Sequence, residues 1–304
     1  MRREFSLAIE KYGEKDERII FLTGDVGFMA LENVRNKLKD RFINMGVAEQ
    51  NLIAVAAGLA SENLIPVCYS IAPFIVFRAI EHIRLDVCLH NMNVKLVGNG
   101  GGYGYGIMGA THHALEDIAV LSCMPNIKCF IPFCNEDVES AVKKMLECPH
   151  SVYLRLGYGN KPADISLAEF SPIRKVYNGN KITIITLGPI VLNVFNSLKI
   201  DSSINDVDIF VVSELPLVNL SEELIESVKR TKKIIVIEEH CKRGGLAENL
   251  ALLLLEKEIN CKIIHLFAKG YPDGTYGSQK YHQKKSELDE ISILNNIKKI
   301  LYEK

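Results

Sequence analysis

The sequence predicts an α/β protein made of two doubly wound domains. Short β-branched runs alternate with longer helical patterns over residues 18–156, and the same alternation returns from residue 182 onward. Between these two regions, glycine, proline, asparagine and mixed charge interrupt the pattern. The 304 residues, 48% of them hydrophobic, are enough for two domains with buried cores.

The first domain is predicted to span residues 1–165. Its elements follow one another in the alternating order that is typical of a parallel sheet with helical connections. They are strand 18–22, helix 49–62, strand 66–68, helix 74–90, strand 94–97, a glycine-rich loop 98–109, helix 115–122, strand 128–131, a helix containing Val138, Val142 and Leu146, and strand 152–156.

Residues 166–180 are predicted to form an interdomain linker, and residues 181–304 a second, smaller domain of the same type. Its expected elements are strand 182–186, helix 191–198, strand 207–212, helix 221–228, strand 234–238, helix 246–255, strand 261–266 and a final helix 291–301. We therefore expect a second sheet covered by helices.

The composition excludes several classes of partner. A formal net charge of -1 and a pI near 6.7 leave no basic excess for nucleic acid or for anionic lipid, so neither is expected to bind. Eight cysteines are present without a CxxC pair, and the opening residues contain no long apolar segment. We expect a cytoplasmic protein with reduced thiols.

The segment 42–59 (FINMGVAEQNLIAVAAGL) places the polar pair Glu49 and Gln50 in apolar surroundings at the start of an alanine-rich helix. Taken alone, a glutamate at a helix start is most simply explained by the helix dipole. The motifs that follow in the chain point to a functional carboxylate instead.

Those motifs are GVAEQN, then APFIVFRA, then a glycine-rich loop that ends in GATHHALED. In this order and spacing the chain resembles the pyrimidine-binding domain of transketolases, and the related deoxyxylulose phosphate synthases are similar at the same points. Beyond the linker, VIEEHCKRGGLAENLA resembles the family's C-terminal domain. The resemblance covers nearly the whole chain and implies thiamine diphosphate as the cofactor.

For the cofactor, the resemblance implies roles for four residues. The carboxylate of Glu49 would bind N1′ of the aminopyrimidine and favour the imino tautomer, whose N4′ takes the proton from the thiazolium C2. Phe74 and Phe77 would flank the pyrimidine ring, although two aromatics at i and i+3 also suit an ordinary core. Asp25, in LTGDVG, would help to shape the cofactor pocket.

For the substrate, the resemblance implies that His112 lies near the sugar hydroxyls and that Arg155, in VYLRLGYG, binds a sugar phosphate. The open alternatives are a structural histidine and a surface ion pair. The glycine-rich loop departs from the family, because Gly100 and Met108 stand where a histidine and an aspartate usually read sugar hydroxyls. The substrate is therefore expected to differ from a standard pentose phosphate.

The diphosphate and metal motif of thiamine enzymes has no counterpart here. Gly24 and Asp25 are followed by valine, and Asn44 comes too soon afterwards, so no metal ligand is assigned to this chain. Because a diphosphate is normally held with Mg²⁺ and oxygen ligands, a separate N-terminal type subunit is expected to supply them, in an α2β2 complex.

The leading hypothesis is thus the C-terminal subunit of a split transketolase, which moves a two-carbon ketol unit from a ketose (phosphate) to an aldehyde. The alternatives are the β subunit of a 2-oxo acid dehydrogenase E1 component, a synthase that uses pyruvate, and a noncatalytic module that only binds a partner protein.

Overall fold

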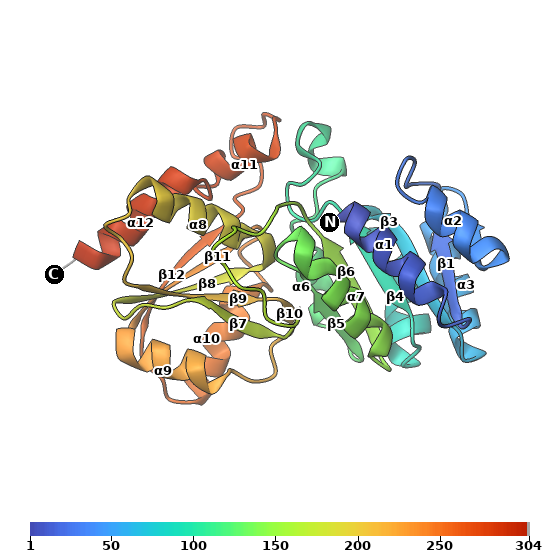
Figure 1. The fold of residues 1–304 in the computed structure, drawn as a ribbon, viewed down its shortest axis with the longest axis horizontal. Coiled ribbons are helices and arrows are strands. Elements are labelled where there is room, and N and C mark those ends of the chain that lie inside the picture. The colour runs from blue at the N-terminus through green and yellow to red at the C-terminus, as the bar shows by residue number, and fades with distance from the viewer. Residues whose placement is uncertain (303–304) are drawn as a thin grey trace.

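A seven-stranded sheet forms the first domain, in the right half of Figure 1. The computed structural model describes residues 1–302. The strand order is β10-β5-β6-β4-β3-β1-β2, and all neighbours are parallel except β10 and β5. The strands are β1 (Ile19–Thr23), β2 (Phe42–Asn44), β3 (Ile65–Ile71), β4 (Lys95–Asn99), β5 (Ile127–Phe130), β6 (Ser151–Leu156) and β10 (Glu214–Leu215).

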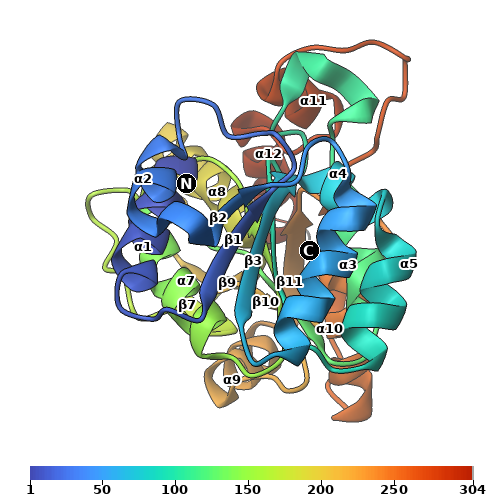
Figure 2. The ribbon, with the colours of Figure 1, turned by 90° about the vertical axis from the view of Figure 1, so that its right-hand side faces the viewer.

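Helices cover both faces of this sheet, because its central strands are apolar on both sides (Figure 2). On one face lie α1 (Arg2–Gly13), α2 (Glu32–Leu38) and α7 (Val138–Glu147). On the other lie α3 (Glu49–Ser61), α4 (Ala72–Phe77), α5 (Ile80–His82), the π-helical segment η2 (Ile83–Leu89) and α6 (Asp117–Ser122). Short 3-10 turns complete the domain: η1 (Lys39–Arg41), η3 (Gly106–Thr111) and η4 (Asn135–Asp137).

A five-stranded sheet forms the second domain, in the order β12-β11-β8-β9-β7. Its strands are β7 (Ile173–Tyr177), β8 (Ile182–Leu187), β9 (Val207–Val212), β11 (Lys233–Glu238) and β12 (Lys262–Phe267). One face packs against α8 (Val191–Ile200) and α12 (Glu290–Tyr302), and the other against α9 (Glu222–Thr231) and α10 (Leu246–Glu256). The turn η5 (Gly188–Ile190) and helix α11 (Gln279–Lys285) lie outside these layers. The predicted fold class, two doubly wound α/β domains, is confirmed.

Three short strands differ from the sequence prediction, and the first of them, β2, pairs parallel with β1 at the edge of the first sheet. Strand β7 lies within the predicted linker 166–180 and pairs antiparallel with β9, at the edge of the second sheet. Strand β10 comes from the second half of the chain but pairs with β5 of the first sheet. Strand β7 was not predicted because its charged residues are not typical of a buried strand. Arg174 is buried here because its Nη1 and Nη2 donate to the two carboxylate oxygens of Asp137, at 2.7 and 2.6 Å.

Each sheet has a point where the chain reverses its direction of winding. In the first sheet, β1 lies between β2 and β3, and in the second, β8 lies between β9 and β11. Ligands of open α/β sheets bind outside the carboxyl ends of the strands at such a point. The fold therefore indicates two places for ligands, one in each domain.

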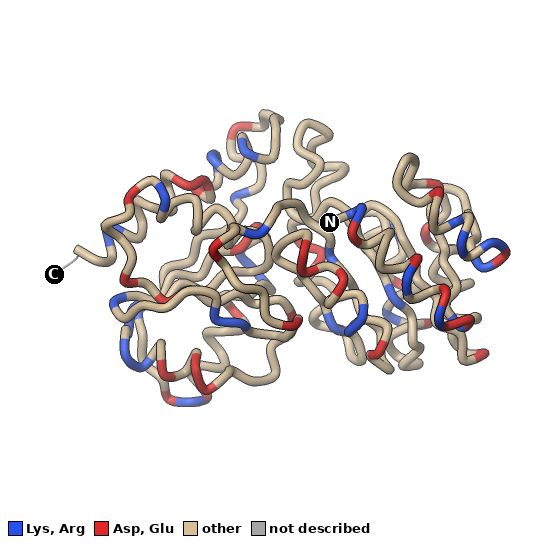
Figure 3. Tube along the Cα trace, in the orientation of Figure 1, with Lys and Arg blue, Asp and Glu red and all other residues tan. Residues whose placement is uncertain are grey.

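Basic and acidic residues are interspersed over both domains, as Figure 3 shows. The loop that includes η3 is an exception, because residues 96–115 contain no Lys, Arg, Asp or Glu. Within residues 1–302, none of the helices has the length and apolar character that crossing a membrane requires.

Candidate active site

Glu49 lies at the winding reversal of the first sheet, as the first residue of α3, and is 3% exposed. Both of its carboxylate oxygens have donors. Ser70, near the end of β3, donates its hydroxyl to Oε1 at 3.0 Å, and Nη1 of Arg78 lies 3.0 Å from Oε2. The helix start also favours a negative charge here. The sequence thus places a buried, oriented carboxylate at the edge where ligands of this fold bind.

An open cavity of about 600 Å³ lies in front of this carboxylate. Its lining consists of the start of α3, the residues before it, and the residue after α4: Val47, Ala48, Glu49, Gln50, Asn51 and Arg78. Glu49 forms the buried wall of the cavity, and Val47 at its rim is largely exposed.

Arg78 lies between the carboxylate of Glu49 and the ring of Phe74. Its guanidinium carbon is 3.8 Å from the centroid of the Phe74 ring, a cation–π contact, and its side chain is 44% exposed. The guanidinium is thus a planar group held by an aromatic face and a carboxylate. Phe77, at the end of α4, is 38% exposed. Arg78 was not singled out from the sequence, although it lies inside APFIVFRA.

His112 follows η3 and contacts the same aromatic ring. The centroids of His112 and Phe74 are 5.0 Å apart in an edge-on arrangement, and Nδ1 of His112 lies 2.8 Å from the hydroxyl of Thr111. The structure therefore brings together Glu49, Phe74 and His112, which are far apart in the sequence. This half-buried imidazole can donate to or accept from a ligand in front of Phe74.

Tyr105 accounts for the glycine at position 100, where the family usually has a histidine. Gly100 has φ +79°, and a Cβ at this position would clash with the Tyr105 ring. The phenol accepts a hydrogen bond from Nδ2 of Asn99 at 2.8 Å, and its ring lies 5.7 Å from that of His112. Sequence reasoning missed Tyr105, which fills the space that a side chain at position 100 would enter. Met108 is 53% exposed on η3.

Asp25 lies on the same edge of the sheet but outside the cavity at Glu49. It is exposed, has φ +56°, and accepts a hydrogen bond from Nδ2 of Asn44 at 2.8 Å. A separate cavity of about 210 Å³ is lined by both residues. Among residues 1–302, no group of three or more His, Cys, Asp or Glu side chains is placed to hold a metal ion.

Arg155 is buried in β6, and internal groups occupy much of its guanidinium. Nε donates to Asp117 at 2.9 Å, and Nη2 donates to the carbonyls of Ala114 and Glu239 at 2.5 and 3.2 Å. The phenol of Tyr153 donates to the same Asp117 oxygen at 2.7 Å. Arg155 therefore joins β6 to the end of the glycine-rich loop and to the second domain. Its role in phosphate binding stays a prediction.

Further side chains that the sequence did not reveal hold the glycine-rich loop. Glu239 accepts from the amide of Tyr103 at 2.7 Å, and a Cβ on Gly102 would clash with Glu239. His113 lies 2.7 Å from the phenol of Tyr271 and 2.8 Å from the carbonyl of Gly106. Burial lowers the pKa of His113 to about 4. The glycines thus allow the backbone to lie against the second domain.

The neighbouring Glu238 explains the glycine pair of VIEEHCKRGGLAENLA. Its carboxylate accepts from the amides of Leu246 and Ala247, at 2.7 and 3.1 Å, at the start of α10. A Cβ on Gly245 would clash with this carboxylate. Glu238 is therefore a structural residue that caps a helix, whereas Glu239 contacts the loop.

The two doubly wound sheets, with a buried carboxylate at the winding reversal of the first, define a two-domain α/β protein, and family profiles assign it to one family. Residues 1–162 match the family profile "Transketolase, pyrimidine binding domain", and residues 173–280 match "Transketolase, C-terminal domain". The chain belongs to the transketolase family. The second match begins at Ile173, the first residue of β7.

Among relatives, the chain is 30% identical over 279 residues to one of the subunits of an apulose-4-phosphate transketolase from Phocaeicola vulgatus, covering 90% of this chain and 87% of that protein. It is 28% identical to a 1-deoxy-D-xylulose-5-phosphate synthase of Clostridium perfringens, covering 96% of this chain but 48% of the synthase. A solved structure described as a split gene transketolase, inactive beta4 tetramer, is similar with a TM-score of 0.83 and 27% identity, covering 99% of this chain and 97% of that one.

Proposed function

We propose that this chain is the pyrimidine-binding subunit of a split transketolase that depends on thiamine diphosphate. It transfers a two-carbon ketol unit from a ketose phosphate to an aldehyde. The names of the relatives support a divided enzyme, since one is a transketolase subunit and another a split-gene transketolase. The name of the first relative makes apulose 4-phosphate the first donor to assay.

The single observation on which the proposal depends is the buried carboxylate of Glu49. When bound, thiamine diphosphate supplies a carbon nucleophile that can attack a ketose carbonyl. Glu49 would hold a hydrogen bond to N1′ of the aminopyrimidine, and its burial would strengthen this charge-assisted contact. Phe74 supports one face of the ring. Arg78 occupies the same place between Phe74 and Glu49, so it would have to move aside for the cofactor to bind.

On the substrate side, His112 and Tyr105 lie next to one another near Phe74. We assign them to the sugar hydroxyls, with Tyr105 in the space that the family's histidine at position 100 would use. Arg155 remains the candidate for the phosphate, and Phe77 and Asp25 remain candidates for contacts with the cofactor. This set of groups suits a ketose whose hydroxyl pattern differs from the usual pentose phosphates.

A second type of subunit holds the diphosphate and Mg²⁺, and we expect an α2β2 complex. Large apolar side chains support this proposal, because they are exposed on the edge and loops that carry the site: Phe28, Met29, Val47, Ile107 and Met108. Phe28 and Met29 are 84% and 83% exposed. A partner that covers them would also close the cavity in front of Glu49.

The variant Glu49→Gln tests this function. In the complex with the partner chain, we expect kcat to fall at least about 100-fold, because the amide cannot share a proton with the ring. The loss of unfolding free energy should be about 1 kcal/mol or less, since Arg78 is partly exposed. Glu62→Gln, the same change at the exposed end of α3, serves as the control. Turnover of Glu49→Gln within about threefold of the unmodified enzyme would contradict the assignment.

The isolated chain tests the division of the enzyme. With thiamine diphosphate and Mg²⁺ but without a partner, it should show no transfer, and addition of the partner chain should restore it. Transfer by the chain alone would refute the split enzyme. Calorimetric titration of thiamine diphosphate into the complex separates an enzyme from a noncatalytic module, which need not bind the cofactor.

A pyruvate-using synthase is the second candidate, because the chain also matches a 1-deoxy-D-xylulose-5-phosphate synthase. Such an enzyme releases carbon dioxide from pyruvate, whereas a transketolase releases a shortened aldose. An assay of the complex with pyruvate or branched-chain 2-oxo acids, against ketose phosphates, distinguishes these activities. Consumption of pyruvate or a 2-oxo acid without ketol transfer would replace the leading proposal.

A further inference from the structure

The guanidinium of Arg78 occupies one side of the cavity in front of Glu49. Arg78 follows α4, and its backbone amide donates to the carbonyl of Phe74 at 3.3 Å. Residues four positions apart are neighbours on a helix surface, so the stacking of Arg78 on the Phe74 ring follows from local structure. The contact with Oε2 of Glu49 comes from a different helix, α3. Arg78 thus joins the two helices through the candidate site.

The two oxygens of Glu49 have different surroundings. Oε1 accepts from the hydroxyl of Ser70, which is fully buried. A Cβ on Gly24 would lie 3.5 Å from Oε1, so the backbone also encloses this side of the carboxylate. Arg78, the partner of Oε2, is 44% exposed and lines the cavity, whereas Ser70 and Gly24 do not line it. One partner of the carboxylate is therefore fixed, and the other can move.

The guanidinium has few other contacts in the described part of the chain. Within residues 1–302, Glu49 is the one carboxylate within ion-pair distance of Arg78. Because water screens the charge of a side chain that is 44% exposed, this ion pair is weak. A cation–π contact of an exposed side chain is weak for the same reason. Arg78 can therefore occupy the cavity and still be displaced from it.

A guanidinium and an aminopyrimidine ring offer the same two features to these residues. Both are flat groups that can lie against an aromatic face, and both can bring a nitrogen-bound proton to a carboxylate. Two flat groups cannot share the one place between the Phe74 ring and Oε2 of Glu49. Binding of a ring there and retention of the Arg78 contact therefore exclude one another.

The carboxylate of Glu49 needs a partner even in the absence of a cofactor. A buried, unpaired carboxylate destabilises a folded chain. Under the proposed function, the chain meets the cofactor only together with the partner that holds the diphosphate, and until then Arg78 supplies the positive charge. A displaced guanidinium has acceptors nearby, because the exposed carboxamides of Gln50 and Asn51 line the same cavity.

Building on the proposed function, we propose that Arg78 is a placeholder for the aminopyrimidine. Without the cofactor, Arg78 pairs with Glu49 and covers the Phe74 ring. On binding, Arg78 withdraws its N–H from Oε2, and Glu49 takes up the contact with N1′ in return, so that the carboxylate is paired before and after the exchange. Arg78 thereby stabilises the chain without cofactor and lowers the affinity of the complex for thiamine diphosphate.

Calorimetric titration of thiamine diphosphate with Mg²⁺ into the complex with the partner chain tests the competition. Arg78→Met keeps a long unbranched stem and removes the cation. This variant should bind the cofactor about 3- to 10-fold more tightly, because no ion pair or cation–π contact has to be broken first. Arg78→Ala, which also removes the stem, should change the affinity in the same direction. Arg84→Met, an exposed arginine of η2 that does not line the cavity, should bind like the unmodified complex.

Urea unfolding of the chain alone tests the ion pair without the cofactor. Arg78→Met should lower the equilibrium constant for folding about 3- to 10-fold. The same substitution in the Glu49→Gln background should have a clearly smaller effect, since a neutral amide does not need a cation. The two positions should therefore show coupling in a double-mutant cycle. Equal effects of Arg78→Met in both backgrounds would overturn the role of the pair.

Two results of the titration would overturn the proposal. Equal affinity of Arg78→Met and the unmodified complex would show that Arg78 and the ring do not compete. Weaker binding by Arg78→Met would make Arg78 a ligand of the cofactor instead of a placeholder. Failure of the unmodified complex to bind thiamine diphosphate is a distinguishable result, because it would refute the proposed function and the placeholder together, whereas the unfolding of the chain alone would still measure the ion pair with Glu49.

Discussion

The loss of unfolding free energy at acid pH should depend on His113, a buried residue that contacts the backbone of the glycine-rich loop. The imidazole is 3% exposed, with the Tyr271 phenol at Nδ1 and the Gly106 carbonyl at Nε2. The carbonyl can only accept, so Nε2 carries the proton and Nδ1 accepts from the phenol. Burial lowers the pKa of His113 from its ordinary value of 6.5 to about 4. The buried ring is therefore neutral in the folded protein.

The sign of the pH effect follows from this difference. Below pH 6.5 the unfolded chain takes up a proton at His113 that the folded chain takes up only near pH 4. The folded state thus keeps its full stability above pH 6.5 and loses it as the pH falls toward 4. From these two pKa values, the loss between neutral pH and about pH 5 amounts to about 2 kcal/mol of unfolding free energy.

Urea unfolding of His113→Gln and of the unmodified chain, at neutral pH and at about pH 5, measures this contribution. The variant should be less stable at neutral pH but should lose about 2 kcal/mol less on acidification. Tyr271→Phe is the control, since it keeps the imidazole and removes only the phenol that contacts it. The same acid slope in His113→Gln and in the unmodified chain would refute the reasoning.

Three further variants test other parts of the site and fold. Tyr105→Phe should raise the donor KM about 3- to 10-fold by removing one hydroxyl contact while the ring still fills the space at Gly100; an unchanged KM in steady-state assays would exclude this contact. Asp117→Asn leaves the buried Arg155 without a charged partner, so urea unfolding should show a loss of about 3 kcal/mol, and a loss near zero would contradict the buried pair. Glu238→Gln removes an acceptor at the start of α10 and should cost about 1–3 kcal/mol; calorimetric unfolding at an unchanged temperature would argue against the cap.

The parallel sheets could be predicted from the sequence because their signals are local. Runs such as residues 182–186 and 234–238 are β-branched and apolar, and the structure has β8 and β11 there. The helix that starts at Glu49 is predicted in the same way and is confirmed as α3. Strand β7 could not be predicted, since Arg174 looks exposed until Asp137, from the first domain, is placed against it.

Around Glu49, too, the residues in local motifs could be predicted, whereas those whose position depends on packing could not. The motifs GVAEQN and APFIVFRA indicate Glu49 and Phe74 as parts of a site, and the structure places them on either side of Arg78. Arg78 itself gives no signal, because its position between a carboxylate and a ring depends on how α3 and α4 pack. Tyr105 escapes prediction for a similar reason: the loop must fold back before its ring can reach Gly100.

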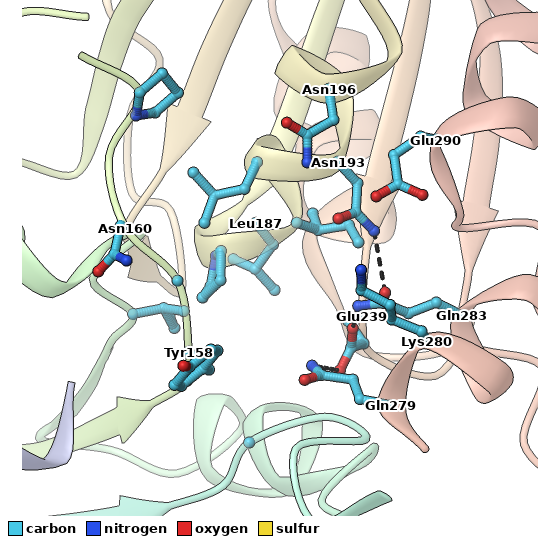
Figure 4. Close-up of a pocket in the computed structure, with 18 of the residues that line it drawn as sticks. Tyr158, Asn160, Leu187, Asn193, Asn196, Glu239, Gln279, Lys280, Gln283 and Glu290 are labelled. Carbon is cyan, nitrogen blue, oxygen red and sulfur yellow. Dashed lines mark hydrogen bonds between the residues drawn. The ribbon is translucent and has the colours of Figure 1, made fainter. Parts of the chain in front are cut away.

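The repeated glycines of the glycine-rich loop show what a local sequence pattern can predict and what it cannot. In sequence they suggest lost sugar contacts, at Gly100 above all. In the structure, Gly100, Gly101 and Gly102 are among the positions of close approach, where a Cβ would strike Tyr105, Arg155 or Glu239. Arg155 and Glu239 also line a cavity of about 420 Å³ between the two domains (Figure 4). The loop therefore lies between this cavity and the imidazole of His112, which contacts Phe74. The side chains of Glu239 and Arg155 contact the loop directly, so a displacement of either one is passed to the loop, since tightly packed atoms move together. Alanine at Gly102, whose Cβ would strike Glu239, should therefore disturb both the interdomain cavity and the position of His112.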